Sequence, residues 1–115
     1  ELSSIKELIA TYQASTYKSL GIVCKTESQA REMADKLQIP DIHFLSNQST
    51  AFVQGIVITS AHIAKGLEFD EVIIPQVDDK NYHSEIDRSM LYVAVTRAMH
   101  RLTLTYSRNK TPLFD

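Results

Sequence analysis

The hydrophobic residues of this 115-residue chain follow two patterns: continuous apolar runs, and apolar positions spaced three and four residues apart. The runs predict buried strands, because a strand that is covered on both faces is apolar throughout. The expected strands are Leu20–Cys24, Ile42–Leu45, Gly55–Thr59, Glu71–Ile74 and Leu102–Tyr106. The spaced positions predict helices. The expected helices start at Ser3 or Ser4, at Thr26 or Ser28, and at Ser84, the last reaching Ala98, with a short helical turn at Ile63–Leu67.

Strands that alternate with helices predict an α/β fold, a mostly parallel sheet with helices on both faces. No internal repeat, low-complexity tract or linker interrupts the pattern, so we expect residues 1–115 to form a single domain. Tyr92 is expected either in the core or against a neighbouring domain. The other residues of the last helix that are expected to face the core are Ile86, Met90, Leu91, Val93, Ala94 and Val95.

Composition and charge narrow the possible functions. The net charge of −2 argues against a freestanding nucleic-acid-binding domain, although it is compatible with a domain that touches one strand at a few points. No apolar run approaches the ~18 residues that a membrane helix needs, so we expect no membrane association. The single cysteine, Cys24, lies in an apolar run, which favours a reducing, cytoplasmic compartment. Because the first residue is Glu1 rather than methionine, we interpret the chain as a piece of a longer protein.

The segment after the Gly55–Thr59 strand carries the first candidate site. Ligands of open parallel sheets bind at the carboxyl ends of strands, where this segment is expected to lie. Lys65 is a mobile positive charge suited to phosphate, and Gly66 lets the backbone approach a ligand closely. Glu68 can accept hydrogen bonds from sugar hydroxyls. Alone, this short motif is weak, and a solvated loop with a glycine helix cap is the better reading, so the functional interpretation depends on a second motif.

The second motif runs from Leu91 to Ala98 and ends a helix on an arginine that apolar burial does not explain. Arg97 can hold a developing phosphate charge with its planar fork of donors. Its alternative roles are a surface salt bridge or a favourable charge near a helix C-terminus.

Residues at the start of the first motif are candidates for contacts with nucleic acid. The hydroxyl of Ser60, or of Thr59, and the imidazole of His62 could bond phosphate or sugar without reading sequence. A lone histidine is more often structural, so that reading stays open for His62. The sequence predicts no metal site, because the remaining histidines have no ligand-like spacing with each other or with the cysteine.

Together, and in this order, the two motifs resemble those of UvrD/Rep-type superfamily 1 helicases, where both belong to the second RecA-like motor domain. The resemblance implies a RecA-like fold of the P-loop NTPase type, with ATP and Mg²⁺ held mainly by the first motor domain of the same polypeptide. It implies that Lys65 lies near the terminal phosphate of ATP and that Glu68 contacts the ribose. Gly66 is then also part of the ATP-binding site, and Arg97 is both an ATP-binding residue and a catalytic arginine finger. It also implies single-stranded DNA as a partner, with Ser60 on the path that the DNA strand follows across the domain.

The chain has no Walker A motif, since Gly21, Gly55 and Gly66 are its only glycines and none belongs to a G-x-x-x-x-G-K-[ST] sequence. Alone it is therefore expected to be inactive as an ATPase. The arginine-bearing motif that usually opens the second motor domain is not recognisable either. We interpret the chain as part of an ATP-dependent DNA helicase.

A short connection suggests a branch of the family. UvrD, Rep and PcrA-type enzymes insert a large accessory domain where this chain has only residues 38–54. The chain thus resembles the compact, HelD-like relatives, for which RNA polymerase is an alternative partner. An α/β binding module without motor function is a lesser alternative, because neither an acidic phosphorylation pocket nor a flavin loop is visible.

Overall fold

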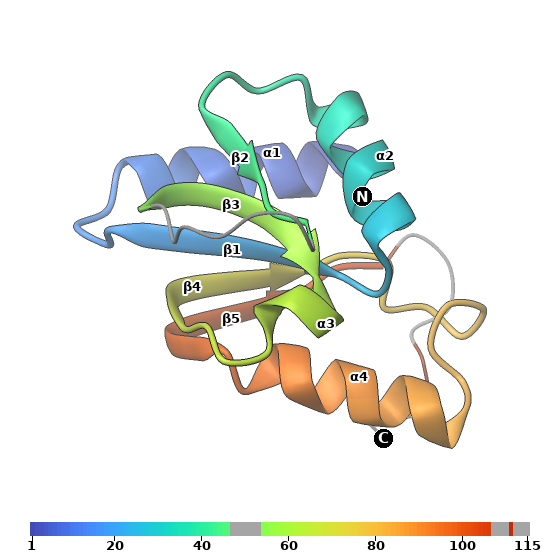
Figure 1. Cartoon of the computed structure of the whole chain (residues 1–115). Helices are drawn as coiled ribbons and strands as arrows, with labels where there is room; N and C mark the ends of the chain where they lie inside the picture. The colour runs from blue at the N-terminus through green and yellow to red at the C-terminus, as the bar shows by residue number, and fades with distance from the viewer. Residues whose placement is uncertain (47–53, 107–110, 112–115) are drawn as a thin grey trace.

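The computed structural model describes residues 1–46, 54–106 and 111. In this part of the chain, parallel strands form one sheet in the order β2-β3-β1-β4-β5 (Figure 1). The strands are β1 Ser19–Cys24, β2 Ile42–Phe44, β3 Gly55–Ser60, β4 Phe69–Ile74 and β5 Ala98–Leu104. The helices are α1 Leu2–Gln13, α2 Glu27–Leu37, α3 Ala61–Ala64 and α4 Glu85–Val95. The predicted α/β fold class is confirmed.

Helices cover both faces of the sheet, as predicted. Strand β1 shows this by alternation: Leu20 and Ile22 pack in the core that α1 and α2 cover, whereas Val23 packs in the core that α3 and α4 cover. Gly21 also belongs to the second face, where an added Cβ would lie 2.5 Å from the ring of Phe69. The close approach of that ring is the physical reason for a glycine in a central strand. None of the described helices is long and apolar enough to cross a membrane.

The helix starts agree with the prediction at α2 and differ at α1. The hydroxyl of Thr26 accepts a hydrogen bond from the Gln29 N–H at 3.2 Å, as an N-cap does. Helix α1 instead begins at Leu2, with Glu1 as N-cap and without a side-chain capping bond, so the predicted start at Ser3 or Ser4 is wrong. The carboxylate of Glu1 accepts hydrogen bonds from the Gln76 N–H and the hydroxyl of Thr105, so tertiary contacts anchor this end of the helix.

The predicted boundaries of four elements around the motifs are also wrong. Helix α3 covers Ala61–Ala64 rather than Ile63–Leu67, because the cap lies at Ser60. Helix α4 ends at Val95, and β5 starts at Ala98 rather than Leu102. Strand β4 starts at Phe69 rather than Glu71. The early strand starts follow from a backbone bond that joins the two segments: the Phe69 N–H donates to the Arg97 carbonyl at 2.9 Å.

The buried face of α4 differs from the predicted one. Leu91 and Ala94 are buried as predicted, but Ile86 is 75% exposed and Tyr92 is 69% exposed, so neither belongs to the core. The neighbour of Ile86, Asp87, is buried instead. The predicted polar turn after β2 and the predicted C-terminal tail lie largely outside the described residues.

Candidate functional site

The carboxyl end of β3 continues directly into α3 and holds both hydroxyls that were candidates for nucleic-acid contact. Ser60 is the N-cap of α3, and its hydroxyl accepts a hydrogen bond from the Ile63 N–H at 3.4 Å. The Thr59 side chain is fully buried, and its hydroxyl donates to the Leu45 carbonyl at 2.9 Å. That bond joins the end of β3 to the end of β2. The Thr59 hydroxyl therefore serves the fold and does not reach the surface.

The polar residues that follow are presented to solvent. His62, Lys65, Gly66 and Glu68 are all exposed. Within the described part of the chain, no residue forms a hydrogen bond or ion pair with the side chains of His62, Lys65 or Glu68. Gly66 has φ +91°, a left-handed conformation that disfavours any residue with a Cβ, although the space around it is open. The backbone angle, not crowding, therefore explains the glycine at this position. The side chains of His62, Lys65 and Glu68 remain available to a ligand.

Arg97 lies against this turn. Its Nε donates to the Val93 carbonyl at 3.1 Å, its Nη2 to the Thr96 hydroxyl at 3.0 Å, and its Nη1 to the Leu67 carbonyl at 3.4 Å. The first two bonds place the positive charge at the C-terminal end of α4, where free carbonyls and the helix dipole favour a cation. The third reaches into the other motif, because Leu67 stands between Gly66 and Glu68.

The sheet holds the two motifs together. Strand β4 pairs with β5 from Phe69 and Ala98 onward, so the pairing begins directly after Glu68 and Arg97. The structure therefore brings Lys65, Gly66, Glu68 and Arg97 to adjoining segments of one region, although 30 positions separate Leu67 from Arg97 in sequence.

An ion pair that the sequence did not predict lies at the carboxyl end of β1. The ammonium of Lys25, just after that strand, is 2.8 Å from Asp87 Oδ1 and donates to the Asn81 carbonyl at 2.7 Å. The other carboxylate oxygen accepts hydrogen bonds from the backbone N–H groups of His83 and Ser84. The hydrogen bond with Lys25, followed by these backbone bonds, holds the pKa of Asp87 far below its ordinary value. Asp87 is thus a buried anion that ties the start of α4 to β1.

The sequence contains a weak signal for one member of this pair. A lysine directly after a fully apolar strand stands at the ligand edge of a parallel sheet, as Lys25 does. Its partner could not be found from spacing, because 62 positions separate Lys25 from Asp87. Asp87 also forms a capping box with Ser84, which fixes the first turn of α4.

The donor set of this region fits an anionic ligand only in part. Lys65 and Arg97 supply positive charge, and Gly66 leaves the backbone open. Among the described residues, no group of three or more His, Cys, Asp or Glu side chains could hold a metal ion. Cys24 is buried, as its apolar surroundings in the sequence predicted. This burial raises the pKa of its thiol to about 12, so the group stays a neutral thiol. The described residues alone therefore do not form a complete nucleotide site.

Comparison with known families decides what this region belongs to. The family model of the UvrD-like helicase C-terminal domain matches residues 2–109. The chain belongs to this family. The predicted resemblance to UvrD/Rep-type helicases is therefore confirmed at the level of the domain, and both motifs lie inside the matched residues.

Curated relatives of this UvrD-like domain are much longer than the chain. DNA helicase II of Escherichia coli (strain K12) is 33% identical over 73 residues, which cover 55% of this chain and 10% of that protein. ATP-dependent DNA helicase UvrD2 of Mycobacterium tuberculosis (strain ATCC 25618 / H37Rv) is 34% identical over 73 residues, covering 52% of this chain and 10% of the relative. The matched part of the chain thus spans about a tenth of these relatives.

Solved structures agree with this membership. The C-terminal domain of a possible DNA helicase from Lactobacillus plantarum WCFS1 superposes with a TM-score of 0.83 and 26% identity, covering 97% of this chain and 70% of that one. An Arterivirus helicase, nonstructural protein 10, solved with DNA, matches with a TM-score of 0.55 and 17% identity over 92% of this chain and 26% of that one. The second likeness concerns the fold alone.

Proposed function

We propose that this UvrD-like domain is the second RecA-like motor domain of an ATP-dependent superfamily 1 DNA helicase or translocase. The observation that carries the proposal is the bond between Arg97 and the Leu67 carbonyl, which joins the two motifs at one place. An exposed cation, an open glycine backbone and an exposed carboxylate surround that bond. Such a set suits one side of a nucleotide, with the phosphate cradle supplied by a first motor domain of the same polypeptide.

The proposed nucleotide roles follow from the chemistry of the side chains. Lys65 would hold the terminal phosphate as a point charge, beside the open backbone of Gly66. Glu68 would accept hydrogen bonds from ribose hydroxyls. Arg97 is the proposed arginine finger, whose guanidinium would leave the Leu67 carbonyl to stabilise charge that develops on the phosphate. ATP and Mg²⁺ are the proposed cofactors, bound mainly by the first motor domain.

The proposed contact with single-stranded DNA rests on His62. Its imidazole is exposed on α3, which follows β3 directly, and could bond phosphate or sugar independently of base sequence. Ser60 supports this contact by capping α3 and thereby fixing the turn, and its hydroxyl can still donate. The buried Thr59 hydroxyl, already donated to the Leu45 carbonyl, supports the turn from inside.

Replacement of Arg97 tests this function. In a full-length helicase that carries this domain, Arg97→Ala should lower kcat for ATP by roughly 10³-fold or more with little change in KM, because a finger acts on the transition state. Arg31→Ala, an exposed arginine on α2, is the matched control and should leave kcat unchanged. A melting curve of each variant tests whether the fold survives. If kcat stays within about twofold of wild type, Arg97 is not a finger.

Within this proposal, residues 1–115 act as one domain without accessory insertion, and the isolated chain has no ATPase activity. The second candidate function is a HelD-like ATPase that remodels RNA polymerase. The short connection between α2 and β3 favours it, since only residues 38–54 separate these elements. Two pull-downs of the full-length protein, one with purified core RNA polymerase and one with single-stranded DNA, distinguish the two partners. Retention by the polymerase favours the HelD-like function, and retention by DNA favours the helicase.

A further inference from the structure

Strand β5 forms one edge of the described sheet, with β4 as its neighbour. The Thr105 N–H donates to the Ile74 carbonyl at 3.0 Å, and the Thr105 carbonyl accepts from the Val77 N–H at 2.8 Å. Main-chain groups alternate in direction along a strand, so those of Leu102 and Leu104 point to the outer side. This row of outward donors and acceptors is a template for another strand.

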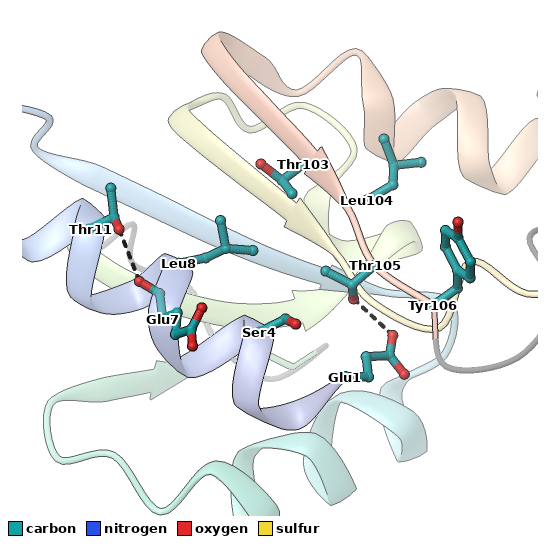
Figure 2. Close-up of a pocket in the computed structure, with 9 residues that line it drawn as sticks. All are labelled: Glu1, Ser4, Glu7, Leu8, Thr11, Thr103, Leu104, Thr105 and Tyr106. Carbon is teal, nitrogen blue, oxygen red and sulfur yellow. Dashed lines mark hydrogen bonds between the residues drawn. The ribbon is translucent and has the colours of Figure 1, made fainter.

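A groove of about 460 Å³ runs beside this edge, between α1 and β5 (Figure 2). The leucines of β5 pack toward α4, so Thr103 of β5 and Thr105 just after it face α1 and form one wall of the groove. Hydroxyls and carboxylates dominate the lining. The polar residues are Ser4 and Thr11 of α1, Thr103 and Thr105 on the strand side, and Glu1 and Glu7.

The groove has a net negative lining. Among the described residues that line it, only Glu1 and Glu7 have charged side chains, and no lysine or arginine is present. Even with the α-amino group of Glu1, the lining stays net negative. The carboxylate of Glu1 is partly used, since it accepts from the Thr105 hydroxyl at 2.8 Å. The Glu7 side chain is exposed and bonds no other described residue, while the Glu7 backbone carbonyl accepts a hydrogen bond from the hydroxyl of Thr11. A cationic ligand is favoured here and a nucleic-acid backbone is disfavoured.

We propose that an extended peptide segment with lysine or arginine at alternate positions binds this groove and adds a strand to the outer edge of β5. Main-chain bonds to Leu102 and Leu104 provide the affinity, as in other cases of strand addition. Side chains on one face of the added strand project toward α1, where Glu7 accepts a cation. Tyr106, which lines the groove and is 47% exposed, offers apolar surface to the stem of a basic side chain.

The test uses the ¹⁵N-labelled 115-residue chain and an acetylated, amidated octapeptide of alternating lysine and valine. Binding should shift the amide signals of Leu102 and Leu104 and those of Ser4, Glu7 and Thr11 on α1. An octapeptide of alternating glutamate and valine should bind at least about tenfold more weakly at low ionic strength.

Two further comparisons separate strand addition from charge attraction alone. N-methylation of the lysine amides and of the valine amides blocks opposite edges of the added strand, so one methylated peptide should lose binding and the other keep it. Glu7→Gln should weaken binding about threefold, the size typical of one exposed charge pair. Asp35→Asn, an exposed carboxylate of α2 that does not line the groove, should change nothing.

Three results would each overturn the proposal. The first is equal affinity for the lysine and glutamate peptides, and the second is full binding of both N-methylated peptides. The third is a set of shifted amides that omits Leu102 and Leu104. None of these measurements depends on ATP or on the arginine finger, so the proposal stands or falls separately from the proposed motor function.

Discussion

The ion pair between Lys25 and Asp87 allows a quantitative prediction. Lys25→Met keeps an unbranched side chain of similar size and removes its charge. The change deletes the 2.8 Å contact with Asp87 and the hydrogen bond to the Asn81 carbonyl. Asp87 then remains a buried carboxylate that keeps its bonds to the backbone N–H groups of His83 and Ser84.

The expected loss follows from burial. Removing one partner of a buried ion pair costs about 3–5 kcal/mol when the remaining charge has no other partner. Here the Lys25 side chain is 21% exposed and Asp87 keeps two backbone donors, so the free energy of unfolding should fall by about 2 kcal/mol. For a domain of this size, that corresponds to a drop in melting temperature of about 8 °C. Lys36→Met, which removes an exposed pair with Glu32, should leave the melting temperature nearly unchanged.

The loss should also depend on pH with a defined sign. The folded-state pKa of Asp87 is lowered, so its contribution is fully present above the unfolded carboxyl pKa of about 3.9 and is lost as pH falls further. Lys25 is the largest cause of that lowering. The gap between wild type and Lys25→Met in urea denaturation should therefore be full at pH 7 and shrink between about pH 4 and 2. A gap below about 0.5 kcal/mol at pH 7, or one that is constant with pH, would refute this reasoning.

The remaining predictions concern the candidate site in a full-length helicase that carries this domain. Glu68→Gln should weaken nucleotide binding, seen as a higher KM with kcat nearly unchanged, because a ribose contact exists in both ground and transition states; an unchanged nucleotide Kd contradicts the assignment. His62→Ala should reduce DNA-stimulated ATPase and spare the unstimulated rate, whereas equal loss of both rates with a lower melting temperature makes His62 structural. The isolated chain should show no ATP turnover, and activity that survives repurification would disprove this.

The central strands were predictable because their environment is simple. In β1 every residue is buried, so a continuous apolar run identifies it. Strand β5 gave a weaker signal at its start, where Met99 and His100 are exposed. An edge strand has less burial to mark it, so hydrophobicity alone placed its start at Leu102, four residues late.

The buried face of α4 could not be predicted from hydrophobicity. An isoleucine is expected inside and an aspartate outside, yet Ile86 is exposed and Asp87 is buried. The reason is a partner far along the chain: Lys25 and the backbone donors before α4 compensate the buried charge. Single-sequence patterns contain the capping signal of Ser84 but not the identity of that distant cation.

The two motifs could be recognised by resemblance, whereas their contact could not. Composition and spacing indicated a phosphate-suited lysine and an unexplained arginine, and nothing in them indicated that Arg97 bonds the Leu67 carbonyl. That contact depends on the parallel register that sets Phe69 opposite Ala98. Register between strands 29 positions apart is a tertiary property, fixed by packing on both faces of the sheet.

The bonding of Arg97 also explains why an arginine suits this position better than a lysine. Three separate nitrogens of the guanidinium reach three acceptors, the carbonyls of Val93 and Leu67 and the hydroxyl of Thr96. A lysine ammonium is one point charge and could not span the same set. The bond to Leu67 is the longest, at 3.4 Å, so it is the one that a stronger anionic acceptor would displace first. Because Leu67 lies between Gly66 and Glu68, any ligand that draws Arg97 away also frees the backbone of that turn.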